Sequence, residues 1–102
     1  MSTIARLHPA KRYSEASVHN GAVYLTGQVA DDATQDIGGQ TAQVLAAVDR
    51  LLADAGTDKT KLLTTNIWLT DIGTFDEMNK VWDAWVAPGC APARATVEAK
   101  LA

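Results

Sequence analysis

The sequence is poor in the features that build disulfides, metal clusters and membrane spans. Cys90 is the only cysteine, so neither an intrachain disulfide nor a cysteine-based zinc cluster can form, which suits a reducing compartment. No stretch approaches the roughly 20 unbroken apolar residues of a membrane-spanning helix. The segment from Met1 to Arg6 lacks the apolar core of a secretory signal. We therefore expect a cytoplasmic protein that does not contact membranes.

Positive charge is scarce as well. The 9 Lys and Arg residues stand against 12 Asp and Glu residues, which gives a formal net charge of −3. Binding to nucleic acid rests on neutralising phosphates, and Lys11–Arg12 is the only adjacent basic pair in the chain. No Gly-rich phosphate loop or nucleotide motif is present either. Nucleic acid is therefore disfavoured as a partner.

The remaining polar residues show no pattern typical of a metal site or of acid–base catalysis. His8 and His19 are far apart, and we interpret them as surface or hairpin residues. Asp31–Asp32 is typical of a solvated loop, and Asp76–Glu77 suits a helix N-terminus better than a catalytic pair. Cys90 has no histidine partner by motif, which disfavours a nucleophilic role.

The first half of the chain predicts a hairpin of strands. Hydrophobic content of 47% over 102 residues is typical of one globular domain, assigned here to residues 1–102. A short strand is predicted over Thr3–Leu7, followed by strands over Tyr13–His19 and Ala22–Thr26. Asn20–Gly21 lies between these two, and Asn-Gly is typical of the type I′ turn of a hairpin because both turn residues need a positive φ.

Two helices are predicted. The first begins between Thr34 and Asp36 and ends at Gly56, because apolar residues recur at helical spacing between them. The members of this stripe are Val44, Leu45, Val48, Leu51, Leu52 and Ala55. The second helix is expected to begin with a capping box formed by Thr74 and Glu77, and to stop at Pro88–Gly89.

Two further strands complete the expected sheet. The segment Leu62–Thr70 is apolar on both faces, with Leu63, Ile67 and Leu69 on one side and Leu62 and Trp68 on the other. A final strand begins near Ala93. This order of elements predicts an α+β fold in which two helices pack on one face of a mixed sheet.

The opposite face of that sheet lacks a cover. Tyr24 and Trp68 are expected there, and we interpret the three tryptophans, Trp68, Trp82 and Trp85, as core and interface residues. An exposed apolar sheet of this size usually means self-association. We therefore expect an oligomer with sites at the seams between subunits.

Arg94 is the first candidate for a binding residue. It is the only charged residue between Ala91 and Val97, and it follows Pro92 at the start of the last strand. Strand alternation places Arg94, Thr96 and Glu98 on one face, opposite the alanines and Val97. A guanidinium at such a place can grip a carboxylate or phosphate as a fork. The alternative is a surface arginine in a salt bridge.

Several short pieces together carry a family resemblance. They are Tyr13, Val23–Gln28, Gln40–Thr41, Leu51–Leu52 with Gly56, Phe75 with Met78–Trp82, and Pro92–Val97. In their order and spacing the chain resembles the Rid family, the reactive intermediate deaminases, also called YjgF, RutC or L-PSP endoribonuclease-like proteins. It is most similar to the small YoaB-like members.

The resemblance implies a chorismate-mutase-like homotrimer with a cleft at each subunit interface. It implies a hydrolase that converts 2-imino or enamine acids into ammonia and a 2-oxo acid. Arg94 matches the arginine that grips the substrate carboxylate. Tyr13 matches an aromatic residue at the cleft, Thr26 a hydroxyl residue, and Asn79 an asparagine that shapes the site. Thr96 stands where many members have a cysteine.

Two departures from the family pattern bear on activity. Thr96 removes the thiol, although its hydroxyl can still form hydrogen bonds. Family members usually continue into one more strand, often with a glutamate proposed to position water, whereas this sequence ends at Ala102. No water-positioning carboxylate can therefore be named. Because imines hydrolyse readily, a positioning site suffices, and we expect no metal and no organic cofactor.

Two other functions remain open at this stage. The same cleft would serve a non-enzymatic binder or regulator that holds a small carboxylate. Some relatives are instead labelled endoribonucleases or translation inhibitors. The acidic charge and the lack of an acid–base pair speak against the latter.

Overall fold

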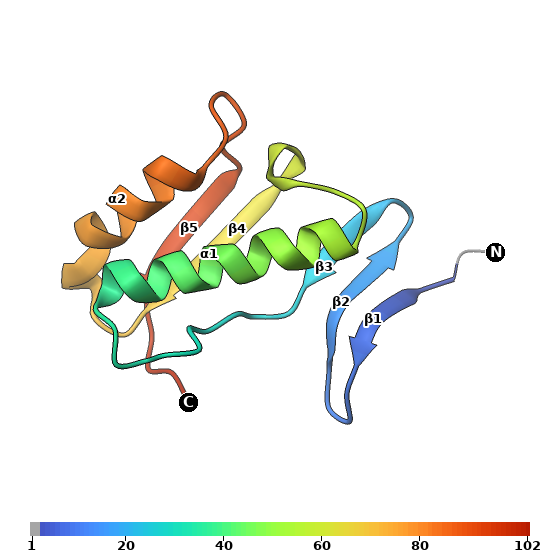
Figure 1. The fold of residues 1–102 in the computed structure, drawn as a ribbon, viewed down its shortest axis with the longest axis horizontal. Coiled ribbons are helices and arrows are strands. Elements are labelled where there is room, and N and C mark those ends of the chain that lie inside the picture. Colours follow the sequence, from blue (N-terminus) through green and yellow to red (C-terminus); the bar gives the residue numbers. More distant parts are fainter. Residues whose placement is uncertain (1–2) are drawn as a thin grey trace.

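The computed structural model describes residues 3–102. Strands β1 (Ala5–Pro9), β2 (Ser14–His19) and β3 (Ala22–Leu25) form an antiparallel sheet in that order. They are followed by α1 (Ile37–Asp54), β4 (Thr64–Leu69), α2 (Phe75–Trp85) and β5 (Ala93–Glu98), with short 3-10 turns at Lys59–Lys61 and Ile72–Thr74. Strands β4 and β5 pair in parallel, and α1 lies across the space between the two sheets (Figure 1).

The expected mixed sheet is divided in two. The α+β class and the two helices are confirmed, but within residues 3–102 the strands form one three-stranded and one two-stranded sheet. The prediction of a single sheet was wrong because β4 finds its partner only in β5, while β3 finds its partner only in β2. In Figure 1, β4 lies between β5 and the three-stranded sheet.

The predicted hairpin is confirmed. Asn20 and Gly21 have φ values of 50° and 79°, and His19 pairs with Ala22 across the turn. Both turn residues therefore adopt the left-handed conformation that a type I′ turn requires. The strand before the hairpin covers Ala5–Pro9 rather than Thr3–Leu7.

Helix α1 begins and ends where the sequence indicates. The Asp36 side chain accepts a hydrogen bond from the Gly39 N–H at 2.8 Å, which satisfies one of the free amides of the first turn. The helix ends at Asp54, and Gly56 follows with a φ of +81°. Glycine adopts this conformation without the steric cost that other residues carry.

The capping box predicted for α2 was wrong. The Thr74 side chain makes no capping bond, and its Oγ1 donates instead to the Asp71 carbonyl at 2.7 Å. The reason is the 3-10 turn Ile72–Thr74, which precedes the helix directly and leaves Thr74 with φ −90° and ψ 9° rather than an extended backbone. Asp71 caps that turn by accepting from the Gly73 N–H.

The faces of β4 differ from the prediction at one residue. Ile67 and Leu69 face the helices, as expected, and Trp68 is 52% exposed on the opposite side. Leu63 is 78% exposed, so its assignment to the helix-facing side was wrong. The 3-10 turn Lys59–Lys61 delays the strand until Thr64, and the alternation of faces does not extend back to Leu63.

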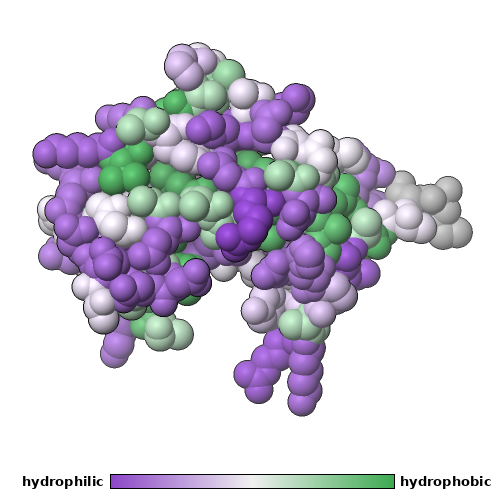
Figure 2. All heavy atoms as spheres, in the orientation of Figure 1, coloured by the Kyte–Doolittle hydropathy of each residue, from purple (hydrophilic) through white to green (hydrophobic). Residues whose placement is uncertain are grey.

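The core lies between the two helices and β4. It is built on Leu45, Leu69, Met78 and Trp82, with half-buried apolar residues of both helices around them. Hydrophilic side chains cover much of the face seen in Figure 2, and hydrophobic ones gather in patches, one of them over α2. No helix within residues 3–102 combines the length and hydrophobicity that a membrane span requires.

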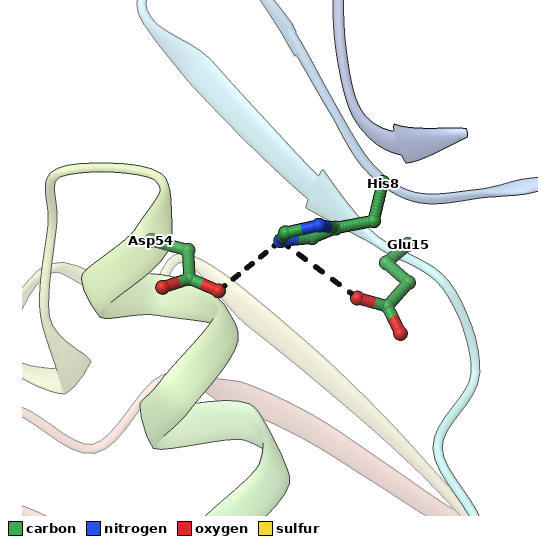
Figure 3. A network of polar contacts seen from close by, with 3 residues as sticks. All are labelled: His8, Glu15 and Asp54. Carbon is green, nitrogen blue, oxygen red and sulfur yellow. Dashed lines mark hydrogen bonds and ion pairs between the residues drawn. The ribbon is translucent and has the colours of Figure 1, made fainter.

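A polar contact ties the three-stranded sheet to the end of α1. His8 Nε2 lies 3.2 Å from Asp54 Oδ2 and 4.0 Å from Glu15 Oε2 (Figure 3). His8 comes from β1, Glu15 from β2 and Asp54 from the last turn of α1. His8 also has a φ of 48°, an uncommon value for a residue with a side chain.

Candidate functional site

Strand β5 presents two different faces, as the sequence predicts. Arg94 and Thr96 are half-buried, whereas Ala93, Ala95 and Val97 are exposed. Thr96 pairs with Ile67 of β4, and Ile67 packs against the core. Paired residues of neighbouring strands point to the same face of a sheet. The Arg94 and Thr96 side chains therefore point toward the helices.

The Arg94 guanidinium rests on two aromatic rings of α2. Its Cζ lies 5.1 Å from the centroid of the Trp82 ring and 5.8 Å from that of the Phe75 ring. Among residues 3–102, Arg94 takes part in none of the ion pairs, so the salt bridge considered as the alternative is not formed within these residues. A guanidinium has five N–H donors and no acceptor atom. Without an acidic partner among these residues, the Arg94 guanidinium is available to a ligand that carries negative charge.

Two buried polar atoms lie beside this arginine. Asn79 Oδ1 and Thr96 Oγ1 are both inaccessible and have no hydrogen-bond partner within residues 3–102. Phe75, Asn79 and Trp82 are spaced four and three residues apart, so they share one stripe of α2. Asn79 therefore lies along the helix between the two rings that Arg94 covers. Thr96 lies on the same face of β5 as Arg94.

We call the five residues Phe75, Asn79, Trp82, Arg94 and Thr96 the Arg94 cluster. Buried polar groups in proteins nearly always have a partner, so two unpartnered ones beside an unpaired cation are unusual. Together they offer a positive fork, an amide acceptor and a hydroxyl. The cluster contains no carboxylate. This set suits a small molecule with a carboxylate and a further polar group.

Tyr13 and Thr26 belong to a different place. They line a surface hollow of about 340 Å³ at the end of the β2–β3 hairpin, together with Glu15, Gly27, Gln28, Val29 and Asp31. The Thr26 N–H donates to the Glu15 carbonyl at 2.9 Å, and Gln28 Nε2 donates to the Thr26 carbonyl at 3.1 Å. Tyr13 is 58% exposed and therefore accessible to a ligand or another chain.

The predicted site residues thus fall into two groups. The structure brings Arg94, Asn79 and Thr96 together, and it brings Tyr13 and Thr26 together. Asn79 lies on α2 and Arg94 and Thr96 lie on β5, whereas Tyr13 and Thr26 flank the β2–β3 hairpin of the other sheet. In Figure 1, β4 lies between β5 and that hairpin. One chain on its own therefore does not assemble all five residues into one cleft.

Sequence reasoning missed the role of two aromatic residues. The sequence singles out Phe75 only as one of the residues that carry the family resemblance, and it predicts Trp82 as a core or interface residue. Trp82 is indeed 6% exposed, but its ring also faces Arg94. The available signal was the spacing of Phe75, Asn79 and Trp82 on one stripe of α2. That signal identifies a helix face but does not say which strand lies against it.

The shifted carboxyl groups lie outside the Arg94 cluster. Hydrogen bonds from Thr34 and Gln35 lower the pKa of Asp32 below its usual range. Hydrogen bonds from Thr60 lower the pKa of Asp58 in the same way. Both aspartates shape local turns, and neither supplies an acid or base to the cluster.

Comparison with known proteins identifies the family. The profile described as Endoribonuclease L-PSP matches residues 3–102. A RutC family protein from Haemophilus influenzae is 45% identical over 101 residues, covering 98% of this chain and 87% of that protein. The RutC family protein YoaB from Escherichia coli is 42% identical over 99 residues, covering 97% of this chain and 86% of that protein.

Solved structures agree with the sequence relatives. A YjgF family member from Neisseria meningitidis superposes with a TM-score of 0.95 at 49% identity, covering 98% of this chain and 83% of that one. A Rid family protein from Yersinia pestis has a TM-score of 0.84 at 35% identity, covering 89% of this chain and 77% of that one. The predicted resemblance is therefore confirmed, and the chain belongs to the L-PSP endoribonuclease family, together with relatives named RutC, YjgF and Rid.

Proposed function

We propose that this protein hydrolyses 2-imino acids and their enamine forms to ammonia and a 2-oxo acid. The observation that carries the proposal is the half-buried Arg94 guanidinium, which within residues 3–102 has no acidic partner and lies next to two polar atoms without a hydrogen-bond partner. A guanidinium binds a carboxylate through two parallel hydrogen bonds, which fixes the orientation of the acid as well as its position.

The reaction needs little beyond positioning. Water adds to the C=N carbon of the protonated imine, the resulting carbinolamine releases ammonia, and a C=O bond replaces the C=N bond. Asn79 Oδ1 can accept a hydrogen bond from the substrate nitrogen or from the water, and Thr96 Oγ1 can donate or accept one. Holding water and imine together lowers the entropic cost of their reaction. The modest demands of imine hydrolysis are consistent with a cluster that contains no carboxylate.

The proposal extends to a homotrimer with shared clefts. The separation of Tyr13 and Thr26 from the Arg94 cluster supports it, because a neighbouring subunit can bring the two groups together. Trp68 and Val97 pair across β4 and β5 and are 52% and 48% exposed on the face away from the helices. Exposed apolar surface of this kind is typical of an interface between subunits.

A second candidate function is the binding of a small carboxylate without catalysis, as in a regulator. The absence of a carboxylate from the Arg94 cluster favours it over the endoribonuclease function that the family description names. Cleavage of RNA needs groups that move protons, and the cluster offers no acid–base pair. The acidic net charge of −3 also disfavours an RNA substrate.

An assay of imine lifetime separates these functions. Iminopyruvate is generated in place by an amino-acid oxidase, and semicarbazide traps the imine that has not yet hydrolysed. Relative to a reaction without the protein, we expect the wild type to lower the yield of trapped imine. The Arg94→Ala variant should leave that yield unchanged. Binding of pyruvate without any effect on trapping would support the regulator instead. RNA cleavage that persists in nuclease-free protein and is lost in Arg94→Ala would favour the endoribonuclease.

A further inference from the structure

We propose that Phe75 and Trp82 form an aromatic clamp that positions the Arg94 guanidinium for the carboxylate of its ligand. The proposal deepens the proposed function, on which it rests for the identity of the ligand. The contacts that form the clamp lie within the protein and do not depend on the identity of the ligand. Phe75 and Trp82 are positioning residues in it, because they act through Arg94.

The geometry of the clamp comes from two elements. Phe75 opens α2, Trp82 lies seven residues further on the same stripe, and Arg94 at the start of β5 reaches over both. The distances of 5.8 Å and 5.1 Å from Arg94 Cζ to the two ring centroids are within the range of a cation–π interaction. Two contacts on one guanidinium restrict its orientation more than either would alone.

A clamp made of rings has an advantage over a salt bridge. An acidic partner would hold Arg94 but would also occupy its N–H donors and neutralise its charge. The face of an aromatic ring attracts the cation through its quadrupole and leaves the N–H edge available for a carboxylate. The arrangement gives a half-buried arginine two contacts with rings while none of the ion pairs within residues 3–102 includes it.

Trp85 provides the contrast within the same helix. Its indole Nε1–H donates to Asp49 Oδ2 at 2.9 Å, and Lys59 Nζ lies 5.0 Å from its ring centroid while donating to its carbonyl. Trp85 therefore links α2 to α1 and to the turn before β4. It lies 5.4 Å from Trp82, centroid to centroid, but has no cation–π contact with Arg94.

The composition of the chain permits an unusually clean test. Phe75 is the only phenylalanine, so growth on fluorinated phenylalanines alters this single ring. Each added fluorine weakens the quadrupole with little change in shape or hydrophobicity. We expect the dissociation constant for pyruvate, measured by calorimetry, to rise stepwise from phenylalanine through mono-, di- and trifluorophenylalanine. The last should bind about 2- to 30-fold more weakly than the first.

A second measurement tests the clamp without any ligand. The Arg94 Nε–H resonance, assigned by its loss in Arg94→Lys, should shift progressively across the same fluorinated series in the unliganded protein. A resonance that ignores fluorination, or affinities for pyruvate that show no trend, would overturn the clamp. A wild type that neither binds pyruvate nor shortens imine lifetime would overturn the proposed function, and the resonance would still decide whether the clamp exists.

Conventional variants provide the matched controls. Phe75→Leu keeps an apolar side chain but removes the ring, and Phe75→Tyr restores it. We expect the first to raise KM more than it lowers kcat, and the second to recover most of the loss. Trp85→Phe, a change of similar size away from Arg94, should leave KM unchanged. Equal effects of Phe75→Leu and Trp85→Phe on KM, at equal melting temperature, would mean that Phe75 acts only through the core.

Discussion

Arg94 and Thr96 project from the same face of β5, two residues apart. Thr96 Oγ1 is buried without a hydrogen-bond partner in the described part of the chain, while Arg94 lies over two aromatic rings. Side chains on one face of this strand therefore carry a charge without an ion-pair partner and a hydroxyl without a hydrogen-bond partner within residues 3–102. A ligand at this place would meet both.

Substitution of Arg94 should abolish carboxylate binding and leave the fold intact. Arg94→Ala is expected to weaken binding of pyruvate by about 2–5 kcal/mol, because a desolvated charge pair is lost. Arg94→Lys should fail largely as well, since an ammonium cannot supply the planar fork. Calorimetry measures the affinity, and Arg50→Ala, an exposed position on α1, is the matched control. Unchanged affinity in Arg94→Ala, with the control also unchanged, would contradict the assignment.

Removal of the Thr96 hydroxyl should weaken ligand binding without lowering the stability of the fold. Thr96→Val keeps the shape of the side chain and removes a buried group that has no partner in the described protein. We expect an unfolding free energy that is unchanged or higher by up to about 1 kcal/mol, together with weaker binding of pyruvate. Urea denaturation and calorimetry measure the two effects. A loss of stability with unchanged affinity would show that the hydroxyl serves the fold and not the ligand.

The contact between His8 and Asp54 should contribute little to stability. Both side chains are about half exposed, at 55% and 45%, and solvent screens such pairs. A double-mutant cycle with His8→Asn and Asp54→Ala is expected to give a coupling of about 0.2–1 kcal/mol that declines at high salt. Asparagine is chosen because it tolerates the φ of 48° at this position. A coupling well above this range would mean that the contact fixes the three-stranded sheet against α1.

Acid should destabilise the fold partly through Asp58. Its pKa is lowered from the ordinary value of 3.8, chiefly by the Thr60 hydroxyl and then by the Thr60 N–H. A lowered folded pKa means that the stabilisation is present above the unfolded pKa and is lost as pH falls through the folded one. Asp58→Asn should therefore lose less stability than the wild type between pH 7 and pH 3. Urea midpoints at the two pH values measure this, and parallel losses in both proteins would contradict it.

Local patterns made much of the fold predictable. The turn at Asn20–Gly21 depends on two residues that favour positive φ, and the faces of β5 depend on simple alternation. Both are properties of a few neighbouring residues. The predicted capping box is absent because the spacing of Thr74 and Glu77 does not specify the backbone conformation of the residues before the helix. Only the turn Ile72–Thr74 in front of α2 reveals that the Thr74 hydroxyl bonds to Asp71.

The sequence patterns do not predict contacts between elements that are distant in the chain. The division into two sheets depends on which strand edges meet, and the pattern of apolar residues does not encode that. In the site, Asn79 lies on the second helix and Arg94 and Thr96 on the last strand, as the sequence predicts, but the sequence does not predict the rings beneath Arg94. The sequence places Phe75 and Trp82 on one stripe of a helix, and only the structure shows that Arg94 of β5 lies over both rings.

The last prediction is that the protein is a homotrimer whose clefts need two chains. The exposed pair Trp68 and Val97 lies on the sheet face that the helices leave uncovered. Exposing it would forgo roughly 25 cal/mol for every Å² of apolar surface. Light scattering at micromolar concentration should give the mass of three chains, and a monomer mass would defeat both the packing argument and the shared cleft.

Subunit mixing then tests which chains build each cleft. The Arg94 cluster is built on α2 and β5, and the Tyr13–Thr26 hollow lies at the β2–β3 hairpin of the other sheet. We therefore expect each cleft to take one group from each of two subunits. Arg94→Ala chains and Thr26→Val chains should each be inactive as homotrimers. Mixed trimers regain clefts in which an intact Arg94 faces an intact Thr26, and imine hydrolysis should return in part. If subunit exchange is verified by mass and no activity returns, each cleft is built from a single chain. The Tyr13–Thr26 hollow then does not contribute to a cleft of the neighbouring subunit.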